Sequence, residues 1–299
     1  MAHLSYRVTL SEFRWTVSIS RIVFVGLIFL CWYNIDELNK VVEVMWEKYL
    51  LQSDALKYHS FDPLLSSLTF SVVMSMWVSV DFYIPYFHRY RISRSDDVKT
   101  YKGRESALWK ETFWYIAPWL VVDFFMQRRE LPISAPTLPT IIWQILLAFI
   151  VFDLFFYIGH RSFHASKFLF KHVHSVHHTS PVIRAADGVR HTFWDGTYGV
   201  LCSVLALKLT HAHPLSSAIF NIIASILICE IHSGMNFPWG LHNLLPLHFM
   251  AGPIVHDTHH RNGKVNFQKY LTYLDYLFGT LKIEPTLQEK EALEMKKLD

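Results

Sequence analysis

Histidine is concentrated in about one third of this 299-residue chain, where 15 of its 18 histidines lie between His160 and His260. Three clusters stand out by their spacing: HRSFH at 160–164, HSVHH at 174–178 and HDTHH at 256–260. Side chains three and four positions apart lie on one face of a helix, with Cβ atoms about 5–6 Å apart. Each cluster can therefore aim its imidazoles at one point. Because neutral imidazole is a common metal ligand at physiological pH, the spacing predicts a metal site.

The number of histidines predicts more than one metal ion. The clusters supply His160, His164, His174, His177, His178, His256, His259 and His260, more than a single tetrahedral or octahedral ion accepts. His232 and Asn236 lie four residues apart after an apolar run and are further candidate ligands, although Asn236 can instead be a turn residue before Pro238. Coordination by nitrogen without thiolate is typical of iron, copper or zinc. A redox-active ion best explains such a site beside a membrane.

Carboxylates near the clusters are candidates for orienting the ligands, because a ligating imidazole usually donates its second N–H to a carboxylate or carbonyl oxygen. The candidates are Asp153, Glu230 and Asp257, followed by Asp195 and Asp275. Asp153 is the strongest, since it precedes His160 by two helical turns and ends a long apolar run. Each can instead be an ordinary helix-end carboxylate. Three histidines outside the clusters are predicted to approach the substrate or the ligands: His172, His191 and His242.

The composition predicts a membrane protein. The chain is 52% hydrophobic and only 18% charged, with a mean hydropathy of +0.21, whereas soluble domains carry about 25% charged residues. A net charge of +3 does not indicate nucleic-acid binding. The cysteines, Cys31, Cys202 and Cys229, lie too far apart in sequence to suggest a disulfide framework or a thiolate metal site.

Apolar runs at 15–33, 64–80, 112–122 and 131–152 are candidates for membrane-spanning helices, which need about 20 such residues. The last run is expected to start its helix at Pro139 and continue towards Gly159. Runs at 196–207 and 214–229 predict a membrane hairpin. We therefore expect an all-α integral membrane protein with about four transmembrane helices and a hairpin, capped by a cytosolic, helical, histidine-rich di-metal region. A soluble protein with buried helices is the alternative.

Charge predicts the orientation of the chain. Basic residues between His88 and Arg104 place that loop in the cytosol, and counting spans returns the chain to the cytosol before His160. Lys296 and Lys297 resemble a dilysine retrieval signal of endoplasmic reticulum membrane proteins, although an ordinary charged tail has the same composition. The predicted organisation is a transmembrane bundle at 1–159, a catalytic region at 160–282 within the same structural domain, and a charged cytosolic tail at 283–299.

The three histidine clusters in this order, with HSGMNFPW between the second and third, resemble the fatty acid hydroxylase superfamily of membrane non-haem di-iron enzymes. The resemblance covers roughly residues 61–282. Three stretches are most similar to members that hydroxylate the sterol side chain: HSGMNFPWGLH, GPIVHDTHH and YLTYLDYLFGTL. Met235 stands where an aromatic residue is usual.

This resemblance implies a set of iron ligands: His160, His164, His174, His177, His178, His232, His256, His259 and His260. Asn236 falls where some members carry a further histidine ligand. The resemblance also implies two iron ions, O2 as co-substrate, and reducing equivalents from NADPH through cytochrome b5 or a reductase. It further implies residence in the endoplasmic reticulum and a lipid substrate that enters from the bilayer.

The predicted activity is O2-dependent hydroxylation of a cholesterol-like sterol at its side chain. Glycine is scarce and no GxGxxG motif follows a strand pattern, so a partner must supply the electrons. A sterol desaturase, a C4-methyl oxidase or a fatty acid hydroxylase on the same scaffold is the nearest alternative, because hydroxylation and desaturation begin with the same hydrogen abstraction. A metal-handling or sterol-binding membrane protein is the alternative from another class, although a transporter would place its ligands within the bilayer.

Overall fold

The computed structural model describes residues 8–92, 107–180 and 182–286, with a few residues of the C-terminal tail. Within these residues the regular elements are helices, joined by two isolated β-bridges. The α-helices are α1 (Leu10–Tyr33), α2 (Ile35–Met45), α3 (Phe61–Tyr83), α4 (Ala107–Phe125), α5 (Leu138–Ala165), α6 (Lys167–Leu169), α7 (Phe193–Leu209), α8 (Pro214–Ile231), α9 (Leu241–Leu244), α10 (Pro253–Asn262) and α11 (Tyr273–Leu277). Short 3-10 or π turns are η2 (Trp46–Leu50), η3 (Asp54–Lys57), η4 (Pro85–Tyr90), η6 (Phe170–His174), η7 (His177–Thr179), η8 (Ala185–Val189) and η9 (Pro246–His248).

Four described helices, α1, α3, α5 and α8, are long and apolar enough to cross a bilayer. The chain is therefore a multi-pass, all-α membrane protein, as the sequence predicts. The run at 112–122 lies in α4, whose described side chains include the apolar stretch Ile116–Phe125. One detail differs from the prediction. The second arm of the predicted hairpin is the long helix α8, and α7 and α8 each pack against α5.

Helix α5 carries the first histidine cluster on its last turns. It begins where Thr137 accepts a hydrogen bond from the backbone of Thr140, with Pro139 in the first turn, where no N–H is needed. The helix then runs for 28 residues, so the boundary predicted at residue 159 lies inside one continuous element. The position of His160 and His164 is thus determined by how this helix packs in the membrane.

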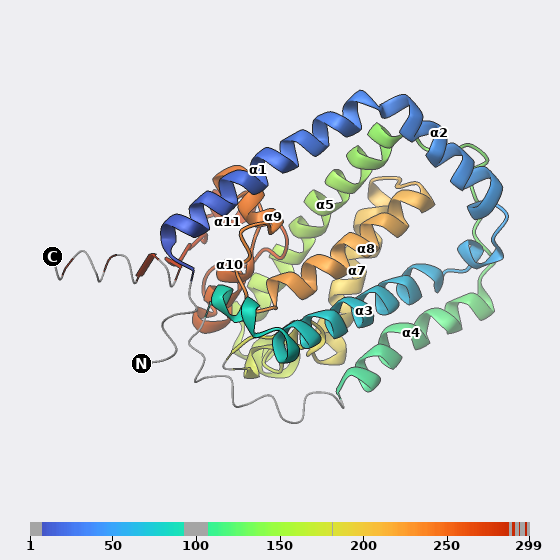
Figure 1. The fold of residues 1–299 in the computed structure, drawn as a ribbon. Coiled ribbons are helices and arrows are strands. Elements are labelled where there is room, and N and C mark those ends of the chain that lie inside the picture. Colours follow the sequence, from blue (N-terminus) through green and yellow to red (C-terminus); the bar gives the residue numbers. More distant parts are fainter. Residues whose placement is uncertain are drawn as a thin grey trace.

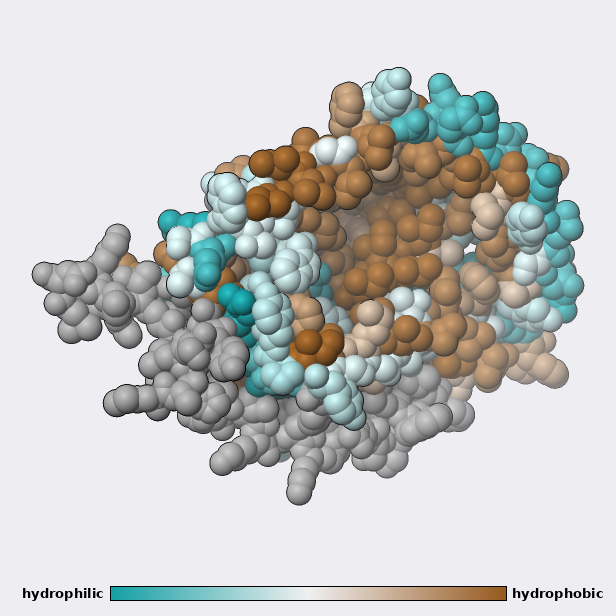
Figure 2. Space-filling model, in the orientation of Figure 1, coloured by the Kyte–Doolittle hydropathy of each residue, from teal (hydrophilic) through white to brown (hydrophobic). Residues whose placement is uncertain are grey.

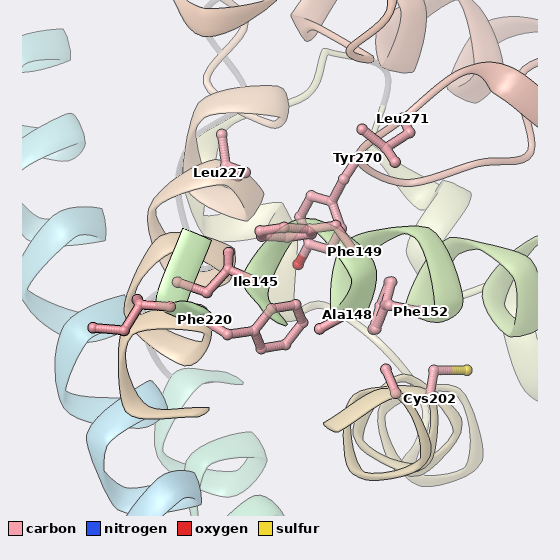
Figure 3. Close-up of a cluster of buried hydrophobic side chains, with 11 residues drawn as sticks. Ile145, Ala148, Phe149, Phe152, Cys202, Phe220, Leu227, Tyr270 and Leu271 are labelled. Atoms are coloured by element: carbon pink, nitrogen blue, oxygen red, sulfur yellow. The ribbon is translucent and has the colours of Figure 1, made fainter. Parts of the chain in front are cut away.

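The main hydrophobic core surrounds α5. Figure 3 shows Phe149 and Phe152 of α5 with Phe220 of α8 and Cys202 of α7 on either side. The ring of Tyr270 lies 5.1 Å from the rings of both phenylalanines, so the C-terminal region closes this core. Close packing of this kind tolerates little movement, and it fixes how α5 is rotated relative to α7 and α8.

The outer surface of the long helices is hydrophobic, whereas hydrophilic side chains gather near α2 (Figure 2). Helix α1 lies apart from the other long helices: Phe13 is its one buried residue, and Trp15 and Trp32 are 69% and 68% exposed. Figure 2 shows a hydrophobic hollow beside it. Because so large an apolar surface is not stable in water, lipid must cover it.

The histidine clusters meet at one end of the bundle, where α9, α10 and α11 lie beside the ends of α5 and α8 (Figure 1). Two sequence predictions concern residues outside the described ranges. Most of the basic loop at 88–104 falls there, and so does Lys296 of the dilysine pair.

Candidate metal centre

Nine histidines form two adjoining groups. The first group contains His160, His164, His174, His178 and His259, and the second contains His177, His232, His256 and His260. Within each group, one ring nitrogen from every member lies within 4.8 Å of the others. The ring centroid of His260 is 4.5 Å from those of both His177 and His178, so the groups touch. The structure therefore brings together all nine histidines that the sequence singles out.

Four segments position these side chains. The end of α5 carries the first cluster, the turns η6 and η7 carry the second, and His232 is the C-cap of α8. Helix α10 carries the third cluster and contributes to both groups. It begins at Pro253 and ends at Gly263, whose positive φ of 68° suits glycine. The second cluster thus lies on a π-helical turn and a 3-10 turn rather than on the α-helix that its spacing predicts.

Hydrogen bonds fix the orientation of six of the nine rings through Nδ1. Five rings donate to backbone carbonyls: His160 to Phe267 (2.7 Å), His177 to Arg190 (3.3 Å), His178 to His260 (3.3 Å), His232 to Ile228 (2.7 Å) and His259 to Val265 (2.8 Å). The sixth, His174, donates to the Asp195 carboxylate at 2.8 Å. Because a carbonyl oxygen only accepts, the proton of each neutral ring lies on Nδ1 and the lone pair lies on Nε2.

These Nε2 lone pairs point at one another. The Nε2 atom of His174 is 3.0 Å from that of His160 and 3.1 Å from that of His178, and His178 is 3.2 Å from His259 in the same way. In the second group, Nε2 of His256 lies 2.8 Å from Nε2 of His232. Two lone pairs cannot form a hydrogen bond with each other, whereas a cation between them accepts both. The donor set therefore fits metal ions.

Burial keeps these rings neutral. Burial, reinforced by neighbouring imidazoles, holds the pKa of His177, His256 and His259 well below the usual histidine value. Burial also lowers the pKa of His232 to about 3. Since only the deprotonated ring nitrogen binds a metal, few protons compete for these ligands at neutral pH.

Asp153 has a different role from the predicted one. Its buried carboxylate accepts hydrogen bonds from the backbone N–H groups of Lys269, Tyr270 and Leu271. These residues belong to the anchor loop (residues 263–272), which also supplies the carbonyls that hold His160 and His259. Asp153 therefore acts on the histidines through the backbone of this loop. Asp275 supports the same loop by accepting from the backbone of Phe267 and Gln268.

Asp153→Ala is expected to lower the unfolding temperature of the purified protein. Three backbone amides would lose their acceptor, and each buried unsatisfied group costs about 1–3 kcal/mol. Asp153→Asn keeps one acceptor oxygen, so its unfolding temperature should lie between those of the wild type and Asp153→Ala. Thermal unfolding in detergent measures the effect, and an Asp153→Ala protein with wild-type stability would contradict this role.

Glu230, Asp257 and Asn236 also differ from the prediction. Glu230 Oε1 lies 3.3 Å from His242 Nδ1, and Asp257 pairs with Arg261 at 2.7 Å. The side-chain oxygen of Asn236 accepts a hydrogen bond from His242 Nε2 at 2.8 Å. In the described part of the chain, no side-chain hydrogen bond joins any of these three residues to the nine imidazoles.

Asp195 is the carboxylate that contacts a ring of the centre. It lies in the first turn of α7, where Thr192 caps the helix by accepting from the Asp195 backbone. Sequence proximity suggested this residue only weakly, because 21 positions separate it from His174. Its contact depends on how α7 packs beside η6.

A cavity of about 560 Å³ lies between α3, α7 and α8, and none of the nine histidines is among its lining residues. One face of α8 lines it from Pro214 to Ile228, which corresponds to about 21 Å of helix. The outer end includes Asp62 and Lys208. At the inner end lie Val189, Ile228 and Lys269, and Ile228 also provides the carbonyl that holds His232.

His191 lies between the centre and a second cavity of about 270 Å³, which shares Val189 and Val200 with the first. Its ring stacks on His177 with centroids 5.2 Å apart. Its buried Nδ1 has no hydrogen-bond partner among the described residues. His172, by contrast, is exposed and packs against Phe168.

Comparisons with known proteins agree with this arrangement. The family model for fatty acid hydroxylase matches residues 145–280, which include all nine histidines. Cholesterol 25-hydroxylase of Homo sapiens is 27% identical over 249 residues, which cover 81% of this chain and 90% of that protein. The enzyme of the same name from Mus musculus is 30% identical over 57% of each chain. Very-long-chain aldehyde decarbonylase GL1-11 of Oryza sativa subsp. indica is 31% identical over 66% of this chain and 75% of its own length. No solved structure gives a significant match.

The fold and the paired histidine groups define a membrane protein with a histidine-rich metal site. The chain belongs to the fatty acid hydroxylase and sterol desaturase superfamily. It is accordingly an oxidoreductase that acts on lipids.

Proposed function

We propose that this protein is a non-haem di-iron monooxygenase that uses O2 to hydroxylate a cholesterol-like sterol at its side chain. The observation that carries the proposal is the division of nine neutral histidines into two adjoining groups beside a lipid-sized cavity. The similarity to cholesterol 25-hydroxylases supports the choice of a sterol.

Each group would hold one iron: His160, His164, His174, His178 and His259 the first, and His177, His232, His256 and His260 the second. When bound, the irons supply the redox chemistry that activates O2 and oxidises an unactivated C–H bond. The protein supplies neutral ligands in fixed orientations, and the packed rings exclude water from the site. Asn236 remains outside this ligand set because its carboxamide bonds to His242.

The lipid reaches this site along the cavity between α3, α7 and α8. The exposed lining is mainly apolar, with serines on α3, α7 and α8 and Asn221 on α8. A hydrophobic substrate held there would be shielded from water close to the metal centre.

Reducing equivalents would come from NADPH through cytochrome b5 or a reductase on the cytosolic side. Residence in the endoplasmic reticulum, with a cytosolic C-terminus, follows from the same proposal. Epitope tagging of the C-terminus, with selective permeabilisation of the plasma membrane, tests this location.

Cells with and without the protein are expected to differ in an oxygenated sterol. Mass spectrometry of their lipids measures this, followed by turnover with iron-loaded protein, NADPH and a reductase. A gain of one oxygen identifies hydroxylation, and a loss of two hydrogens would assign a desaturase instead. The assay includes a very-long-chain aldehyde, because the rice relative is named for this substrate. A fully iron-loaded preparation that leaves all these lipids unchanged would overturn the enzyme assignment.

A further inference from the structure

Lys269 places an amine at the inner end of the substrate cavity. It follows Phe267 in the anchor loop by two residues, and Phe267 provides the carbonyl that holds His160. The other charged residues that line the cavity, Asp62, Arg129 and Lys208, lie towards its outer end. Lys269 is thus the charged cavity residue next to the metal centre.

The Lys269 ammonium has aromatic neighbours rather than a polar partner. It lies 5.0 Å from the ring centroid of Phe156, 5.9 Å from that of Tyr270 and 6.0 Å from that of Phe152. Within the described residues it forms neither a hydrogen bond nor an ion pair. The accessible part of this side chain therefore faces the cavity that it lines.

The two carboxylates that act on Lys269 through space are already engaged. Asp195 binds His174, and Asp153 binds the backbone of the anchor loop. Burial lowers the pKa of the Lys269 ammonium, and Asp195 partly opposes this. The amine donates hydrogen bonds whether or not it is charged. A purely hydrocarbon group lodged against it would leave this buried donor unsatisfied, which is unfavourable.

We propose that Lys269 recognises an oxygen atom at the leading end of the substrate, so that the preferred lipid already carries a hydroxyl, carbonyl or carboxylate oxygen at the end nearest the irons. The inference rests on the proposed function and narrows its substrate to a lipid oxygenated near the reacting carbon. An earlier oxidation of the same lipid tail must then supply this substrate. The protein performs a later oxidation at that end.

The test compares equilibrium binding of two sterols to the full-length protein in detergent: cholesterol, and cholesterol with a hydroxyl at the end of its side chain. The variants are Lys269→Met, which keeps the length without the donor, and Lys269→Gln, which keeps a neutral donor. Lys208→Met is the matched control, because Lys208 lines the outer end of the same cavity. Displacement of a fluorescent sterol reports binding without turnover, and KM is measured where turnover occurs.

Wild type and Lys208→Met are expected to bind the oxygenated sterol about tenfold more tightly or better, the effect of one hydrogen bond to a charged donor. Lys269→Met should lose this preference, and Lys269→Gln should keep part of it. Equal affinity of the wild type for both sterols would overturn the inference. An unchanged preference for the oxygenated sterol in Lys269→Met would also overturn it, because the amine would then only pack against the aromatic rings. The preference without any turnover would refute the proposed function while supporting recognition by Lys269.

Discussion

His177→Ala and His259→Ala are each expected to abolish lipid oxidation while the protein remains inserted in the membrane. The two residues belong to different groups of the centre, so under the proposed function each substitution would remove a ligand from a different ion site. The loss of activity should exceed the roughly 10- to 100-fold effect that follows removal of an outer hydrogen-bond partner. Metal content, measured on the purified protein by elemental analysis, should fall in both variants.

His172→Ala is the matched control for these variants. His172 lies beside the second cluster, but it is exposed and belongs to neither group. Its replacement should leave both metal content and turnover near wild type. Retained turnover in His177→Ala or His259→Ala would mean that the clusters are structural.

Asp195→Ala is expected to weaken metal binding about 10- to 100-fold. The Asp195 carboxylate holds His174 through Nδ1, and His174 Nε2 faces both His160 and His178. Without the carboxylate, the ring loses both its preferred tautomer and its orientation. Competition with a chelator measures the change in affinity.

Asp195→Asn should have a smaller effect, because the amide oxygen still accepts the hydrogen bond. Asp257→Asn serves as the control, since Asp257 pairs with Arg261 and, among the described residues, forms no side-chain hydrogen bond with the nine imidazoles. If Asp257→Asn weakened metal binding as much as Asp195→Ala, a general loss of negative charge would explain the result better than the orientation of His174.

The sequence singles out the nine histidines because their spacing and their places after apolar runs leave a local signal. Spacings of three and four residues bring the side chains of HRSFH and HDTHH to one face, and such spacings are visible in a single sequence. His232 was recognisable from its position at the end of an apolar run. The nitrogen-only composition of the clusters likewise indicates the kind of metal.

The groups that orient these histidines were predicted less well, because their contacts are distant in sequence. Asp153 precedes His160 on the same helix, yet its partners lie in residues 269–271. Five of the orienting acceptors are backbone carbonyls, which carry no side-chain signature at all. The sequence did not single out Lys269 either, because its position in the cavity depends on how the anchor loop packs against α5.

The sequence predicted the all-α membrane class of the fold and the positions of some of its helices. The apolar runs that form α1, α3 and α5 were recognised by length and hydropathy. The run in α8 was recognised as apolar but interpreted as one arm of a hairpin: with 18 residues it is the shortest of the four helices, although its mean hydropathy of 1.8 equals that of α1, and it also contains serines and Asn221. The structure explains them, because Ser217, Asn221 and Ser225 line the cavity on one face of the helix.

Four members of the first histidine group lie within residues 160–178, but the fifth, His259, lies about eighty residues further along the chain. The ribosome must therefore synthesise most of the polypeptide before this group is complete, and contacts so distant in sequence form late. Helices α1, α3, α5 and α8 can enter the bilayer during translation, whereas binding of a metal ion by this group is left to the finished chain. When that metal is scarce, a cell would accumulate an inserted precursor without metal, ready for later loading.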